Sequence, residues 1–166
     1  MPDLPWLDGY SGQTTDELIA LETTYRIDSL VTVFEHAIEQ KAYREGDDKL
    51  TAEERVVLAV EALEREVNNG GYSQFFINSS REYGSIIVES LRQIGCNKTA
   101  DITQNAVHVI EEMPITDGEW EDGDLIENDE RDSALEQYNE QFYSSQESLE
   151  ESLFTFIKAN RSKIEL

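Results

Sequence analysis

Apolar residues recur every three or four positions along most of the chain, which is the spacing of one face of an α-helix. Two of these series follow helix-start signatures, the capping boxes of Thr14 with Glu17 and Thr51 with Glu54. We therefore expect one helix over about 15–41 and a second that begins after the other box. The second series ends at 69–71, where Asn-Gly-Gly can stop a helix because glycine adopts a left-handed conformation without steric cost.

Shorter helical series follow as far as the C-terminus. Their apolar positions are, in chain order, Tyr72, Phe75 and Phe76; Ile87, Leu91 and Ile94; Ile102, Ala106, Val109, Ile110 and Met113; Leu135, Tyr138 and Phe142; and Leu149, Leu153, Phe156 and Ile157. Gly95 and Pro114 mark two helix ends, and an acidic loop is expected over about 114–130. No segment alternates with period two. The pattern predicts an all-α protein, a single compact multi-helix domain over 1–166 with C-terminal acidic helices.

The charge of the chain is strongly one-sided, with 36 acidic against 13 basic residues and a formal net charge of −23. Residues 111–151 hold 16 of the acids and a single base, Arg131. Because nucleic-acid binding requires a basic face, this charge argues against direct contact with DNA or RNA, and an anionic membrane surface would repel the chain. The single cysteine, the absence of a long apolar stretch and the N-terminal composition predict a cytoplasmic protein.

The acids between 119 and 140 form two groups, which we predict to be a partner-binding acidic surface. The first group shares the predicted loop: Glu119, Glu121, Asp122, Asp124 and Glu127. The second group has helical i, i+3, i+7, i+11 spacing and predicts one carboxylate row along a helix, opposite its apolar residues: Asp129, Asp132, Glu136 and Glu140. A solvated face that keeps the protein soluble, or adaptation to high salt, would also explain these acids.

Candidate catalytic and metal-binding groups are few. His36 and His108 each lie within a predicted helix without a set of further ligands, and Cys96 has no evident activating cation. Phosphate-binding glycine loops, dinucleotide fingerprints and hydrolase motifs do not occur in the sequence. We expect a non-enzymatic protein without cofactor or metal.

The segment from Glu66 to Ser80, EVNNGGYSQFFINSS, is the most unusual run of the chain. Its amides could line a small-molecule pocket of a ligand binder or enzyme: Asn68, Asn69, Gln74 and Asn78. A structural role explains them more simply, because helix ends and glycine-rich corners need side-chain partners for their backbone groups. We therefore expect scaffold here, with the pocket as an alternative.

The stretch from Leu50 to Ser80, with IGCNKTADI and the later QFYSSQESLEESL, resembles the nineteen-kilodalton bacterial DNA-mimic protein family over about 15–160. The most specific part of the resemblance is the signature Asn68, Asn69, Gly70, Gly71, Tyr72, Gln74, Phe75, Phe76 and Asn78. It implies an acidic all-α protein, assembled as a homodimer, whose carboxylates occupy the DNA-binding surface of a transcription factor or similar protein. In such a protein the signature serves as scaffold. An immunity or antitoxin-like inhibitor of a basic nuclease is the alternative binding function.

Overall fold

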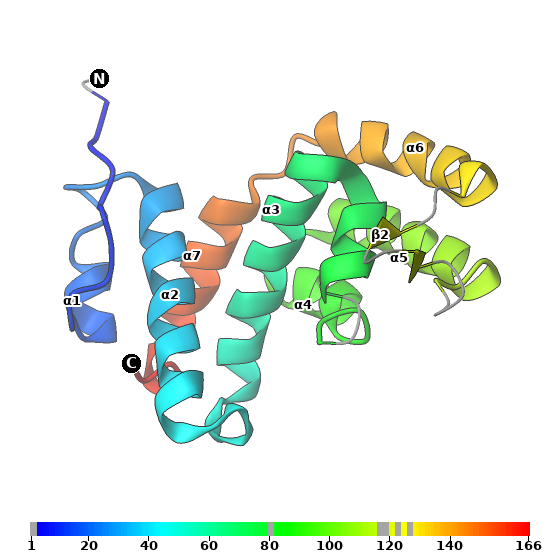
Figure 1. The fold of residues 1–166 in the computed structure, drawn as a ribbon. Helices are drawn as coiled ribbons and strands as arrows, with labels where there is room; N and C mark the ends of the chain where they lie inside the picture. Colours follow the sequence, from blue (N-terminus) through cyan, green and yellow to red (C-terminus); the bar gives the residue numbers. More distant parts are fainter. Residues whose placement is uncertain (1–2, 80–81, 116–119, 122–123, 126–127) are drawn as a thin grey trace. The chain divides into compact units, whose positions relative to one another are not determined.

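The computed structural model describes residues 3–79, 82–115, 120–121, 124–125 and 128–166. The fold is all-α, as the apolar pattern predicts, apart from one pair of two-residue strands (Figure 1). The α-helices are α1 (Thr15–Ile19), α2 (Ile27–Glu45), α3 (Ala52–Ser79), α4 (Ile87–Gln93), α5 (Asn97–Glu112), α6 (Asp129–Tyr143) and α7 (Leu149–Ala159). Short 3₁₀ helices η1 (Asp47–Lys49) and η3 (Arg161–Lys163) accompany them, and β1 (Trp120–Glu121) pairs antiparallel with β2 (Asp124–Leu125).

Internal contacts divide the chain into two compact units. Unit 1 consists of Met1–Glu61, Gln93–Gly95 and Ser148–Leu166, and unit 2 consists of Ala62–Arg92 and Cys96–Glu147. Each unit buries its own set of apolar side chains. In unit 1 helix α2 packs against α7, and in unit 2 α5 packs against α6. In the described part of the chain, no helix is both long enough and apolar enough to cross a bilayer.

The prediction of one helix over about 15–41 is wrong, because α1 ends at Ile19 and α2 begins only at Ile27. Arg26 has an extended backbone, with φ −64° and ψ 138°, and its amide donates to the carbonyl of Pro5 at 3.0 Å. The hydroxyl of Ser29 donates to the Arg26 carbonyl at 2.7 Å. The N-terminal segment thus fixes the start of α2, and a local periodicity cannot reveal contacts with residues more than twenty positions away.

Both predicted capping boxes are present. Thr14 accepts a hydrogen bond from the Glu17 amide at 3.2 Å, and the Glu17 carboxylate accepts one from the Thr14 amide at 2.8 Å. Thr51 and Glu54 exchange the same pair of bonds at 3.1 and 3.0 Å. These boxes satisfy amide groups that have no partner within the helix, so the starts of α1 and α3 are specified locally.

The carboxylate of Glu54 is completely buried and has a second role in unit 1. Its Oε1 accepts from Lys41 Nζ at 2.8 Å and from the Glu165 amide at 3.0 Å. Lys41 Nζ also donates to the Glu165 carbonyl at 2.7 Å. Because each charge is paired and hydrogen-bonded, the burial of this ion pair is tolerated and holds the C-terminal residues on the unit.

Candidate acidic interface on helix α6

Helix α6 carries the predicted carboxylate row and begins at a well-formed N-cap. The side-chain oxygen of Asn128 accepts from the amide of Arg131 at 3.0 Å. Asp129, Glu130 and Asp132 lie in the first turn. Acidic side chains there interact favourably with the positive end of the helix dipole, so the local sequence favours a helix start that is rich in carboxylates.

The buried side of α6 is more polar than its apolar pattern predicts. Arg131, Leu135, Asn139 and Phe142 are the buried residues, with exposed fractions of 1%, 1%, 8% and 8%. Tyr138, which the pattern places among the apolar markers, is only half-buried. The only base of residues 111–151 is therefore an interior side chain.

Two side chains of α6 hold the break in α3. Gly70 and Gly71 interrupt the helical backbone of α3, as the Asn-Gly-Gly sequence predicts. The amide of Tyr72 donates to Asn139 Oδ1 at 2.8 Å, and the hydroxyl of Tyr143 donates to the carbonyl of Val67 at 2.7 Å. In an unbroken helix that amide and that carbonyl would bond within α3. Because Asn139 and Tyr143 are one turn apart, α6 docks along the break.

The break in α3 and its contact with Asn139 require glycine at position 71. Gly71 has φ +80° and ψ −177°, a backbone region that is essentially restricted to glycine. A Cβ there would lie 2.6 Å from Nδ2 of Asn139. The same Nδ2 donates to Glu136 Oε2 at 3.2 Å. The glycine corner is therefore joined through one amide side chain to a member of the carboxylate row.

The row itself faces solvent. Asp129, Glu136 and Glu140 are exposed and Asp132 is half-buried. None of these four carboxylates forms an ion pair with a described residue. At a rise of 1.5 Å per residue the row spans about 16 Å. Like charges three or four residues apart repel each other, so these acids do not stabilise the helix through their mutual contacts.

The predicted loop acids are described only in part. Glu121 and Asp124 are opposite each other in the β1–β2 pairing. Their side chains lie outside the described part of the structure, as do Glu119, Asp122 and Glu127 altogether. Their place in the acidic surface stays a prediction. The predicted loop extends to about 130, whereas helix α6 already begins at Asp129.

The amide-rich segment surrounds an internal carboxylate. Gln74 Nε2 and Asn78 Nδ2 donate to the same oxygen of Glu66, at 2.8 and 2.9 Å. Burial of Glu66 opposes its ionisation, but these hydrogen bonds, together with the neighbouring Arg65, lower its pKa below the ordinary value. Asn68 and Asn69 are exposed. Two of the four amides that could line a ligand pocket are thus committed to a structural contact.

The aromatic residues of the signature form the interior of unit 2. Tyr72 and Phe75 are completely buried, and Phe76 is 3% exposed. The Tyr72 hydroxyl is hydrogen-bonded to Thr103 Oγ1 at 2.8 Å, and burial raises the pKa of this tyrosine. Its ring meets that of Phe142 edge-on, with the centroids 5.9 Å apart. These contacts attach α6 to the apolar core.

Another carboxylate binds the start of α5 within unit 2. Glu147 accepts from the amides of Lys98 and Thr99 at 3.0 and 2.8 Å, and from the Thr99 hydroxyl at 2.7 Å. Partial burial opposes its ionisation, but the hydrogen bonds lower its pKa below the usual range. This residue supplies the N-terminal cap that the preceding Cys96 side chain does not provide.

Other reactive side chains are dispersed. His36 and His108 are both exposed, and His108 shares a 3.2 Å contact with Gln104. Cys96 is 1% exposed. Within the described ranges, no group of three or more His, Cys, Asp or Glu residues could hold a metal ion.

The fold and this surface define a small, acidic, all-helical protein in which a glycine-broken helix supports a helix rich in carboxylates. The chain belongs to the DMP19-like protein family, whose model matches residues 48–160. This match confirms the resemblance to the DNA-mimic family, although it begins at 48 and not near 15. Comparisons with curated proteins and with solved structures found no match.

Proposed function

We propose that the protein is a non-enzymatic DNA mimic, which occupies the DNA-binding surface of a transcription factor or another basic DNA-binding protein. The observation that carries this proposal is the carboxylate row on α6. Asp129, Asp132, Glu136 and Glu140 lie on one rigid element, and none of them forms an ion pair with a described residue. Membership of the DMP19-like family supports the same function.

The spacing of the row supports mimicry on physical grounds. One strand of duplex DNA presents a charge about every 3.4 Å of axis. Over the length of the row, about 16 Å, one strand therefore presents about five charges, and α6 presents four. A single row approaches the linear charge density of one strand. The loop acids at 119–127, or the homodimer that the resemblance implies, would supply the second line of charge.

The supporting contacts also suit this function. A mimic must hold its carboxylates in a fixed pattern, because mobile side chains would lose conformational entropy on binding. Asn139 and Tyr143 fasten α6 at two points one turn apart. A dense negative surface further accelerates the encounter with a cationic partner, and the resulting affinity falls as salt rises.

The test starts with capture of binding proteins from a cell lysate at low salt, followed by identification of the fraction that raised salt releases. The affinity of the captured DNA-binding protein is then measured with the wild type and with the variant D129N/D132N/E136Q/E140Q. We expect a loss of about a hundredfold, because each charge contact contributes roughly 0.5–1 kcal/mol, and we expect duplex DNA to compete with the wild type.

The matched control is E82Q/E89Q/E111Q/E112Q, which removes four exposed carboxylates of unit 2 outside α6. We expect this variant to retain most of the affinity. Equal losses in both variants would show that total charge and not the row determines binding. Selective capture of a basic nuclease, inhibited at its active site, would replace DNA mimicry by the immunity-type function.

A further inference from the structure

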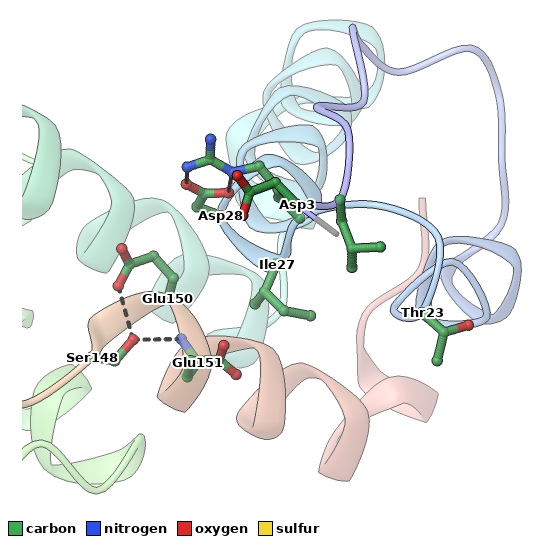
Figure 2. Close-up of a pocket in the computed structure, with 9 residues that line it drawn as sticks. Asp3, Thr23, Ile27, Asp28, Ser148, Glu150 and Glu151 are labelled. Atoms are coloured by element: carbon green, nitrogen blue, oxygen red, sulfur yellow. Dashed lines mark hydrogen bonds and ion pairs between the residues drawn. The ribbon is translucent and has the colours of Figure 1, made fainter. Parts of the chain in front are cut away.

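Unit 1 contains an open groove of about 600 Å³ whose lining includes no residue of α6. It lies between the N-terminal segment, the start of α2 and the start of α7. Figure 2 shows Ile27 between Asp3 and Asp28 on one side and Ser148, Glu150 and Glu151 on the other. Leu4, Thr23 and Arg26 complete the lining. One wall lies outside residues 48–160, so the groove is not a feature on which family membership rests.

The groove combines an apolar floor with an acidic rim. Leu4 is 36% exposed, and Ile27 is half-buried. Four carboxylates line it against one base, and that base is already engaged, because Arg26 Nε donates to Asp28 Oδ1 at 3.0 Å. Glu150 accepts from the Ser148 hydroxyl at 3.1 Å. Among described residues, neither Glu150 nor Glu151 forms an ion pair.

The walls of the groove are fixed in place. The Arg26 amide donates to the Pro5 carbonyl at 3.0 Å, and the Leu7 amide donates to Ser29 Oγ at 3.1 Å. On the opposite wall, Ser148 Oγ accepts from the Glu151 amide at 3.3 Å and caps α7. A site held in this way needs little rearrangement on binding, which lowers the entropic cost.

We infer that this groove docks a segment of the basic partner in which an arginine or lysine adjoins an apolar residue. The apolar side chain and the aliphatic stem of the cation lie on Leu4 and Ile27. The charged head pairs with Glu150 and Glu151, which is the placement that long cationic side chains adopt at a boundary between apolar surface and water. The inference rests on the proposed function and adds a second contact outside α6, with specificity for more than charge.

The test uses the full chain and two fluorescent peptides of equal length and charge, one that alternates Arg with Leu and one that alternates Arg with Ser. We expect the Arg-Leu peptide to bind about tenfold more tightly, because only its apolar side chains can cover the groove floor. L4S is expected to remove this preference. E150Q/E151Q is expected to weaken binding about fivefold, which corresponds to the loss of two exposed ion pairs.

The matched control is E111Q/E112Q, an adjacent pair of exposed carboxylates on α5, which should leave affinity for the Arg-Leu peptide nearly unchanged. Thermal unfolding of every variant establishes that it is folded. Equal binding of the two peptides, or equal loss in both glutamine variants, would overturn the groove assignment while capture through α6 could persist. Conversely, if the groove binds the Arg-Leu peptide selectively but the capture experiment yields no DNA-binding protein, that result would contradict the proposed function and the assignment of its partner.

Discussion

Unit 1 and the outer face of α6 use carboxylates in opposite ways. In unit 1 Glu54 is completely buried, and its oxygens accept from Lys41, Thr51 and Glu165. On α6 the exposed carboxylates of Glu136 and Glu140 form no ion pair with a described residue. The first arrangement stabilises the fold, whereas the second carries like-charge repulsion that a cationic partner would relieve. Net charge alone does not distinguish these two uses.

The difference gives a criterion for finding a binding surface in an acidic protein. Carboxylates that accept two or more hydrogen bonds from internal donors, such as Glu54, Glu66 and Glu147, belong to the scaffold whatever the total charge. Exposed carboxylates on a rigid helix that form no ion pair with a described residue are available for binding. Removing members of the first group should destabilise the fold, whereas removing a carboxylate of the second group beyond the first turn of α6, such as Glu140, should not.

The largest expected effect comes from breaking the buried pair. Lys41→Met leaves the Glu54 carboxyl group buried without its cation, which costs about 3–5 kcal/mol of unfolding free energy. Urea unfolding at neutral pH measures the difference. The control is Lys49→Met, because Lys49 Nζ lies 4.0 Å from Asp48 in a highly exposed pair. We expect that change to cost less than about 1 kcal/mol. Equal effects would contradict a structural role for Glu54.

A smaller, pH-dependent effect is expected at Glu147. Glu147→Gln removes a charged acceptor from the start of α5 and should cost about 1–2 kcal/mol at pH 7. Because the folded-state pKa of Glu147 is lowered, the carboxylate stabilises the fold fully above its unfolded-state pKa, about 4.3. That contribution is lost as pH falls through the folded-state pKa. The gap between wild type and variant should therefore be narrower at a pH below about 4.3 than at pH 7.

Urea unfolding of both proteins at the two pH values measures this gap. Glu82→Gln, which removes one exposed carboxylate from a turn of unit 2, serves as the control and should change stability by less than about 0.5 kcal/mol at pH 7. A gap between wild type and Glu147→Gln that stays constant with pH would assign the effect to packing and not to the charge.

The parts of the fold that the sequence predicts correctly depend on nearby residues. Capping boxes place both partners three positions apart, and the glycines at 70–71 interrupt α3 through their own backbone freedom. The break between α1 and α2 could not be predicted in this way, because Arg26 depends on Pro5. The helical period contains no information about such a contact.

The residues that support the candidate site could not be predicted either, because they also depend on contacts with residues distant in the sequence. Asn139 is an ordinary polar residue of an acidic helix in the sequence. In the structure it is buried and accepts a hydrogen bond from the backbone amide of Tyr72, 67 positions away. Arg131 resembles a surface base and is 1% exposed. The spacing of the row was available from the sequence, whereas the residues that fix its helix were not.

The smallest expected effect tests the outer face directly. Glu140 lies one turn after Glu136, towards the C-terminal end of α6, so like-charge repulsion and the helix dipole both disfavour it. Glu140→Gln should therefore stabilise the protein by about 0.2–0.5 kcal/mol at low salt, and the gain should shrink as salt screens the repulsion. Thermal unfolding at about 0.01 and 1 M salt measures it, with Glu82→Gln again controlling for net charge. Destabilisation by Glu140→Gln would place this carboxylate with Glu54 among the acids that the fold needs, and would remove it from the surface available to a partner.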